Sequence, residues 1–91
     1  MKVRLYTKPA CPLCDKAKAV LATVRERIPF DLEEVDIRSD PELFERYKFD
    51  IPVIHIEGQK AFKHRVDPML FEQRLRRELA GTSDAKADAG E

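Results

Sequence analysis

The sequence predicts an α/β fold: a four-stranded mixed sheet flanked by helices, with the element order β-α-β-α-β-β-α. Short runs of alternating apolar residues, longer runs with apolar residues at helical spacing, and two Asp-Pro helix starts carry this prediction. The chain has 91 residues, 43% of them apolar, which is enough for one modest core. We therefore expect one domain over residues 1–80. Residues 81–91 are small and polar without an aromatic residue, and we expect a disordered tail there.

The chain begins with a strand and a long helix. Lys2–Tyr6 alternates between apolar and polar residues, which predicts a short strand. Pro12–Arg27 is expected to form a helix that ends before Pro29, because apolar residues in and just after it recur at the spacing of one buried stripe. These residues are Leu13, Ala17, Val20, Leu21, Val24 and Ile28.

A second strand and a short helix come next. Phe30–Ile37 is expected to be a strand, but the phase of its apolar residues changes along the run. This change predicts a bulge near Glu33-Glu34 or burial of both faces at one end. Asp40 or Ser39 caps the following helix, and Pro41 takes its first position, where a missing N–H costs nothing. The helix is short, and its residues able to face a core are Leu43, Phe44 and Tyr47.

The second half of the chain predicts a hairpin and a last helix. Ile51–Ile56 and Gln59–His64 are expected to be strands joined by a turn at Glu57-Gly58. Asp67-Pro68 starts a helix that Gly81 can cap. Its expected inner face is Leu70, Phe71, Leu75 and Leu79. Because the first helix crosses between two strands, those strands should be parallel, and the functional site should lie at the carboxyl end of the first strand.

The only two cysteines, Cys11 and Cys14, lie where the first strand gives way to the first helix. Residues three apart on a helix have Cβ atoms roughly 5–6 Å apart, and a disulfide needs Cα atoms about 4.4–6.8 Å apart, so the pair can close a bond. Pro12 at the first helical position makes Cys11 the N-cap residue. The unpaired N–H groups and the positive end of the helix dipole then favour its thiolate, which is the nucleophile. Lys8 adds to this effect if its ammonium reaches the sulfur.

Position assigns different roles to the two sulfurs. Cys11, the more exposed, should attack a substrate disulfide, and Cys14, the more buried, should resolve the mixed disulfide. The same pair could instead be two inert buried thiols, or half of a zinc site completed by His55 and His64. The histidines are nine residues apart, whereas paired zinc ligands usually lie about three to five residues apart. We therefore favour the redox interpretation and expect no metal.

Composition excludes several classes of partner. Lys plus Arg and Asp plus Glu number 17 each, so no overall field attracts nucleic acid or an anionic membrane. No N-terminal segment resembles a signal peptide, and no apolar run is long enough to span a bilayer. We expect a cytoplasmic monomer with no nucleic-acid or membrane partner. In that compartment a cysteine pair is more often catalytic or metal-binding than structural.

Pro52 stands at the start of an apparently central strand, although proline cannot donate a hydrogen bond to a ladder. A cis Ile51–Pro52 bond would account for it, since such bonds are rare and usually serve a purpose. The strand entrance would then turn the backbone of Ile51 or Val53 toward Cys11, where a substrate's backbone could pair as an added strand. The alternative is a trans proline that begins an edge strand, but the cysteine motif upstream favours the cis bond.

The chain resembles the glutaredoxins, and more narrowly the short bacterial glutaredoxin-like proteins of the thioredoxin superfamily. The matching segments are Leu5–Asp15, which holds both cysteines, Glu34–Ile37, and Ile51–Val53. The resemblance covers about residues 2 to 80 and implies a thioredoxin-like fold of the glutaredoxin type. It also implies disulfide oxidoreductase activity in cell redox homeostasis and electron transport, on a disulfide-containing protein or a small thiol substrate.

The resemblance also suggests substrate contacts. Lys8 matches the glutaredoxin lysine that contacts glutathione, and Pro12, Ile51, Pro52 and Val53 would line the same site. Glutaredoxins usually carry a Gly-Gly pair after the fourth strand, but Lys63–Pro68 lacks those glycines. Asp67 remains available to meet the ammonium of glutathione. No bound cofactor is required; glutathione is a candidate co-substrate, and a thioredoxin-reductase-type enzyme is an alternative reductant.

Three functions stay open at this point. The first is an enzyme that reduces disulfides with Cys11 as nucleophile and Cys14 resolving. The second is a binding module in which two subunits, each giving Cys11 and perhaps a glutathione, hold an iron–sulfur cluster. The third is a non-catalytic thioredoxin-like scaffold. Alkylation of Cys11 at the rate of an ordinary thiol would favour the scaffold, and a colourless anaerobic preparation would count against the cluster.

Overall fold

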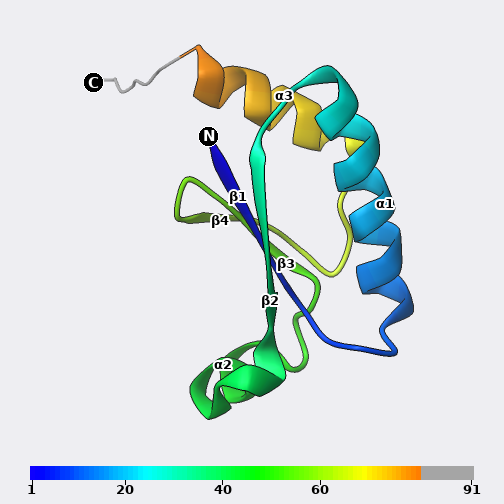
Figure 1. Ribbon diagram of the computed structural model, residues 1–91, viewed down its shortest axis with the longest axis vertical. Coiled ribbons are helices and arrows are strands. Elements are labelled where there is room, and N and C mark those ends of the chain that lie inside the picture. The colour runs from blue at the N-terminus through cyan, green and yellow to red at the C-terminus, as the bar shows by residue number, and fades with distance from the viewer. Residues whose placement is uncertain (81–91) are drawn as a thin grey trace.

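The computed structural model describes residues 1–80 and contains a four-stranded mixed sheet with three α-helices (Figure 1). This confirms the predicted α/β class and element order. Gly81 and the predicted tail lie outside the described residues. The elements are β1 (Lys2–Thr7), α1 (Pro12–Arg27), β2 (Asp31–Asp36), a 3-10 helix (Ile37–Ser39), α2 (Pro41–Tyr47), β3 (Val53–Ile56), β4 (Gln59–Lys63) and α3 (Pro68–Leu79).

The strands lie in the order β2-β1-β3-β4. β1 and β2 are parallel, as predicted, and pair without a break from Lys2 opposite Asp31 onward, so of the two explanations offered for the change of phase the bulge is wrong. β3 runs antiparallel to both β1 and β4, and the turn at Glu57-Gly58 joins the predicted hairpin. The one irregularity in the sheet of the described residues falls in that hairpin, between Ile54 and His55.

The change of phase in β2 arises because the sheet has an apolar core on each face. Leu32 pairs with Val3 and packs against the larger core, whereas Val35 pairs with Tyr6 and packs against the smaller one. Positions of opposite parity point to opposite faces of a sheet. The larger core lies under α1 and α3 and includes Val3, Leu5, Ala17, Leu21, Val24, Ile54, Ile56, Phe71 and Leu75. The smaller core comprises Tyr6, Cys14, Ile37, Tyr47, Ile51 and Val53.

The third strand begins later than predicted. It starts at Val53 rather than Ile51, because the Ile51 N–H donates to the Tyr47 carbonyl at 3.0 Å and Pro52 has no N–H to give. The second strand likewise ends before Ile37, which enters a 3-10 helix. Local hydrogen bonds of the neighbouring helix therefore move each boundary: those of α2 delay β3, and those of the 3-10 helix end β2.

The inner face of α3 is narrower than predicted. Phe71 and Leu75 are fully buried, but Leu70 and Leu79 are 54% and 59% exposed, so their assignment to the inner face is wrong. On a helix of 3.6 residues per turn, these two positions lie about 80–100° around the axis from Phe71. They therefore flank the contact with the sheet.

The elements expected to form the functional site lie together at one end of the molecule. The carboxyl ends of β1 and β2, the start of α1, and α2 all lie at the same end, opposite α3 (Figure 1). Among the described residues, no helix is long and apolar enough to cross a membrane.

Candidate active site

Cys11 and Cys14 lie at the carboxyl end of β1 and the start of α1, as predicted. Their Cα atoms are 5.2 Å apart, and their sulfurs are paired as a disulfide. Cys11 is the N-cap of α1: its sulfur accepts a hydrogen bond from the Cys14 N–H at 3.2 Å, and Pro12 follows at the first position. The sequence Cys-Pro thus places one sulfur against the unpaired N–H groups of the first turn.

The two cysteines differ in exposure. Cys14 is 1% exposed and belongs to the smaller core with Tyr6, Tyr47 and Ile51. Cys11 is partly exposed and packs against the edge of that core. Cys11 is therefore the more accessible of the two residues.

The loop before β3 lies beside the cysteines. The Ile51–Pro52 bond is cis, as predicted, and Ile51 is a member of the smaller core against which Cys11 packs. The Ile51 N–H is already bonded to Tyr47, and the Pro52 carbonyl accepts from the His64 N–H at 2.9 Å. An added strand at this loop would therefore have to pair without the Ile51 N–H.

His64 has a structural role that the sequence did not reveal. Its Nε2 lies 2.9 Å from the Phe49 carbonyl, and its backbone N–H bonds the carbonyls of Asp50 and Pro52. The residue adopts a φ of 67°, an uncommon conformation for a residue with a side chain. His64 thus ties the end of β4 to the loop that flanks Cys11. No local pattern predicts this contact, because its partners lie 12 to 15 residues away.

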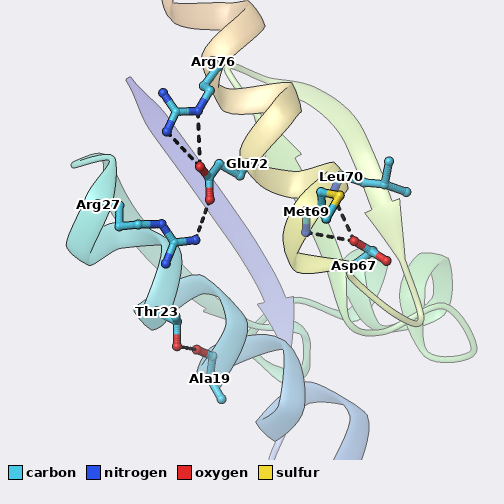
Figure 2. A network of polar contacts seen from close by, with 8 residues as sticks. All are labelled: Ala19, Thr23, Arg27, Asp67, Met69, Leu70, Glu72 and Arg76. Atoms are coloured by element: carbon cyan, nitrogen blue, oxygen red, sulfur yellow. Dashed lines mark hydrogen bonds and ion pairs between the residues drawn. The ribbon is translucent and has the colours of Figure 1, made fainter.

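Lys8 and Asp67 are the two residues predicted to contact the charged groups of glutathione, and their surroundings differ from each other. Lys8 follows β1 directly and is partly exposed, and among residues 1–80 its ammonium makes no hydrogen bond to either sulfur. Asp67 caps α3: its Oδ1 accepts from the N–H groups of Met69 and Leu70 at 2.8 and 3.1 Å (Figure 2). Asp67 therefore has a helix-capping role besides any contact with substrate.

The histidines do not join the cysteines. His55 stands on β3 with its ring edge-on to Tyr6 at a centroid distance of 5.0 Å, while His64 faces Phe49 and Asp50. Within the described part of the chain, no group of three or more His, Cys, Asp or Glu residues could hold a metal ion. The zinc alternative therefore has no set of ligands in this part.

His55 should make stability depend on pH. Its Nε2 is buried without a hydrogen-bond partner; burial, and then the charges of Arg4 and Lys60, hold the pKa of His55 below its usual value. As pH falls below about 6.5, the unfolded chain takes up a proton that the folded chain resists. We therefore expect the free energy of unfolding to decrease from pH 7 toward pH 5.

Chemical denaturation across this pH range measures the effect. Other groups also contribute to the slope, so the test compares the protein with a His55→Phe variant, which keeps an aromatic ring beside Tyr6. In the variant, the free energy of unfolding should decrease less between pH 7 and pH 5 than in the parent protein. An unchanged slope between pH 7 and 5 would refute this role for His55.

Comparison with known proteins agrees with this geometry. The model of the glutaredoxin-like domain family (DUF836) matches residues 2–80. The chain belongs to this family. It is 37% identical over 73 residues to the "Glutaredoxin-like protein YDR286C homolog" of Dictyostelium discoideum, covering 74% of this chain and 68% of that protein.

Solved structures support the same assignment. A structural-genomics target protein from X. campestris is 26% identical, with a TM-score of 0.70 over 81% of this chain and 95% of the other. Glutaredoxin from Brucella melitensis is 30% identical, with a TM-score of 0.55 over 88% of this chain and 85% of the other. Thioredoxin 1 from Thermosipho africanus shares the fold. It is 16% identical, with a TM-score of 0.57 over 84% of this chain and 96% of the other. The protein is a glutaredoxin-like member of the thioredoxin superfamily, and its cysteine pair supports a redox function in general.

Proposed function

We propose that this glutaredoxin-like protein is a thiol–disulfide oxidoreductase that reduces disulfides by a dithiol mechanism. The asymmetry of the cysteine pair carries the proposal. Cys11 is partly exposed and caps α1, where N–H groups and the helix dipole favour its thiolate. Cys14 is buried, with its Cα atom 5.2 Å from that of Cys11, within the range that a disulfide needs.

The reaction proceeds in two exchanges. The Cys11 thiolate attacks one sulfur of the substrate disulfide, forms a mixed disulfide and expels the other sulfur as a thiolate, which takes a proton from solvent. The Cys14 thiol then loses its proton and attacks the sulfur of Cys11. The substrate leaves fully reduced by two electrons, and the enzyme holds the Cys11–Cys14 disulfide. A thiol reductant, glutathione or the dithiol of a reductase, returns the pair to the reduced state.

The residues around Cys11 supply the proposed substrate contacts. Pro12 and the backbone of Ile51, Pro52 and Val53 would contact the part of the substrate next to its disulfide, which is consistent with the packing of Cys11 against the core that contains Ile51 and Val53. Lys8 would meet a substrate carboxylate, and Asp67 an ammonium with the oxygen that does not cap α3. The substrate is a disulfide-containing protein or a small thiol compound, and the protein acts as a cytoplasmic monomer without a bound cofactor.

The first test equilibrates the reduced protein with glutathione redox buffers, quenches with acid, alkylates free thiols and weighs the intact protein. We expect a two-electron oxidation with a single midpoint, which gives the reduction potential of the Cys11–Cys14 pair. Absence of any oxidation would refute the proposal. The spectrum of the same reduced protein, prepared without oxygen, would show whether a coloured cluster is present instead.

The Cys14→Ser variant addresses the use of glutathione. Without a resolving thiol, a mixed disulfide at Cys11 cannot be released from within the protein. We expect intact mass spectrometry to show one glutathione adduct on this variant after exposure to glutathione disulfide. If the variant gives no adduct while the parent protein forms its internal disulfide, a reductase rather than glutathione is the better candidate for the reductant.

A further inference from the structure

A furrow lies between α1 and the start of α3. Two adjoining hollows form it, of about 410 and 370 Å³, and Pro68 lines both. α1 contributes Leu13, which lies between the cysteines, to the first hollow and Arg27 to the second. These two residues are 14 positions apart, which is about 21 Å along a helix. We call this feature the α1–α3 furrow.

Apolar side chains make up much of its lining. The first hollow is lined by Leu13, Ala17, Val20 and Val66 together with Pro68. In the second, Met69 is 70% exposed, and methionine is a flexible side chain that suits binding surfaces. These side chains can contact apolar groups of a bound partner.

The charged residues of the furrow are mostly cationic. Its lining holds four cationic side chains, Lys16, Arg27, Arg65 and Arg76, against two carboxylates, Asp67 and Glu72, although the whole chain is balanced. Both carboxylates are already engaged: Asp67 caps α3, and Glu72 accepts from both Arg27 and Arg76 (Figure 2). Neither Lys16 nor Arg65 is in an ion pair with any residue of the described range.

We propose that the α1–α3 furrow binds the segment next to the disulfide of a protein substrate, and that this segment is apolar with acidic side chains. The inference rests on the proposed function, because Cys11, two residues before Leu13 in the sequence, would hold the disulfide. The acidic side chains meet Lys16 and Arg65, and the apolar ones meet Leu13, Val20 and Met69. A tripeptide spans at most about 11 Å, so a furrow of about 21 Å fits a segment of six or more extended residues.

The test uses two synthetic peptides that share one intramolecular disulfide. In one, the flanking segment alternates Leu and Met with Glu; in the other, Lys replaces Glu. Binding to the protein is measured by fluorescence anisotropy, and reduction by protein freed of dithiothreitol is measured by quenched sampling. We expect the acidic peptide to bind at least about tenfold more tightly and to be reduced faster, with the difference shrinking as salt is raised.

Two double variants separate the furrow from the overall charge. Lys16→Glu/Arg65→Glu should reverse the preference toward the basic peptide. Lys60→Glu/Arg77→Glu changes the net charge equally at positions outside both hollows and should leave the preference in place. Met69→Ser should weaken binding of both peptides without changing which is preferred.

The outcomes distinguish the two proposals. Equal binding of both peptides by the protein, or equal loss of preference in the two double variants, would overturn the furrow as a docking site. Faster turnover of glutathione disulfide than of either peptide, with no measurable peptide binding, would also overturn it and indicate a small acidic substrate. If the acidic peptide binds selectively but no disulfide is reduced, the furrow stands and the proposed oxidoreductase function fails.

Discussion

Replacement of Cys11 by serine should abolish disulfide reduction. A serine hydroxyl does not ionise near neutral pH, so the variant offers no nucleophile at the cap of α1, and the buried sulfur of Cys14 cannot take over the attack. We expect turnover of a small disulfide to fall to the uncatalysed background, a loss of roughly a thousandfold or more. The measurement is the steady-state rate of disulfide reduction with a thiol reductant in excess.

The matched control is Cys14→Ser, which changes the same atom type three residues away. It keeps the attacking thiol and should still form a mixed disulfide, so it completes the first exchange and depends on the external thiol for the second. Both variants should retain the circular dichroism spectrum of the parent protein, because the substitution changes one atom. Dithiol reduction that survived in Cys11→Ser would contradict the assigned roles.

Replacement of Phe71 by alanine should remove most of the stability of the fold. Phe71 is fully buried on the inner face of α3 and lies edge-on to Phe30 and Phe62, with ring centroids 5.8 and 5.9 Å away. Truncating such a side chain costs about 3–5 kcal/mol in lost transfer energy and in the cavity left behind. Small domains unfold with about 5–15 kcal/mol in total, so the variant should be at the edge of folding.

Equilibrium unfolding in urea measures this loss as a large drop in the midpoint with little change in slope. Phe49→Ala is the control, since Phe49 is 82% exposed and the same truncation there should change stability by no more than about 0.5 kcal/mol. Similar losses in the two variants would mean that the core under α3 is not packed as described.

Much of the fold follows from neighbours in the sequence. The alternation in β1, the helical stripe of α1 and the Asp-Pro starts of α2 and α3 involve residues within a few positions of each other, so their predictions were confirmed. The same is true of the cysteine motif. Cys-Pro at a strand-to-helix junction is enough to make Cys11 an N-cap, because the missing N–H of Pro12 suits only the first turn.

Other features depend on contacts between distant segments. A change of apolar phase could not distinguish a bulge from a strand between two cores, because the answer depends on which helices cover each face. Leu70 and Leu79 have the spacing of an inner face, but the line of contact between α3 and the sheet leaves them exposed. His64 contacts Phe49, which is 15 residues away in the sequence. The α1–α3 furrow lies between two helices, and three of the four strands come between them in the sequence. Neighbouring residues in the sequence are enough to predict the cysteine site. The surface proposed to bind a substrate forms only when segments distant in the sequence pack together.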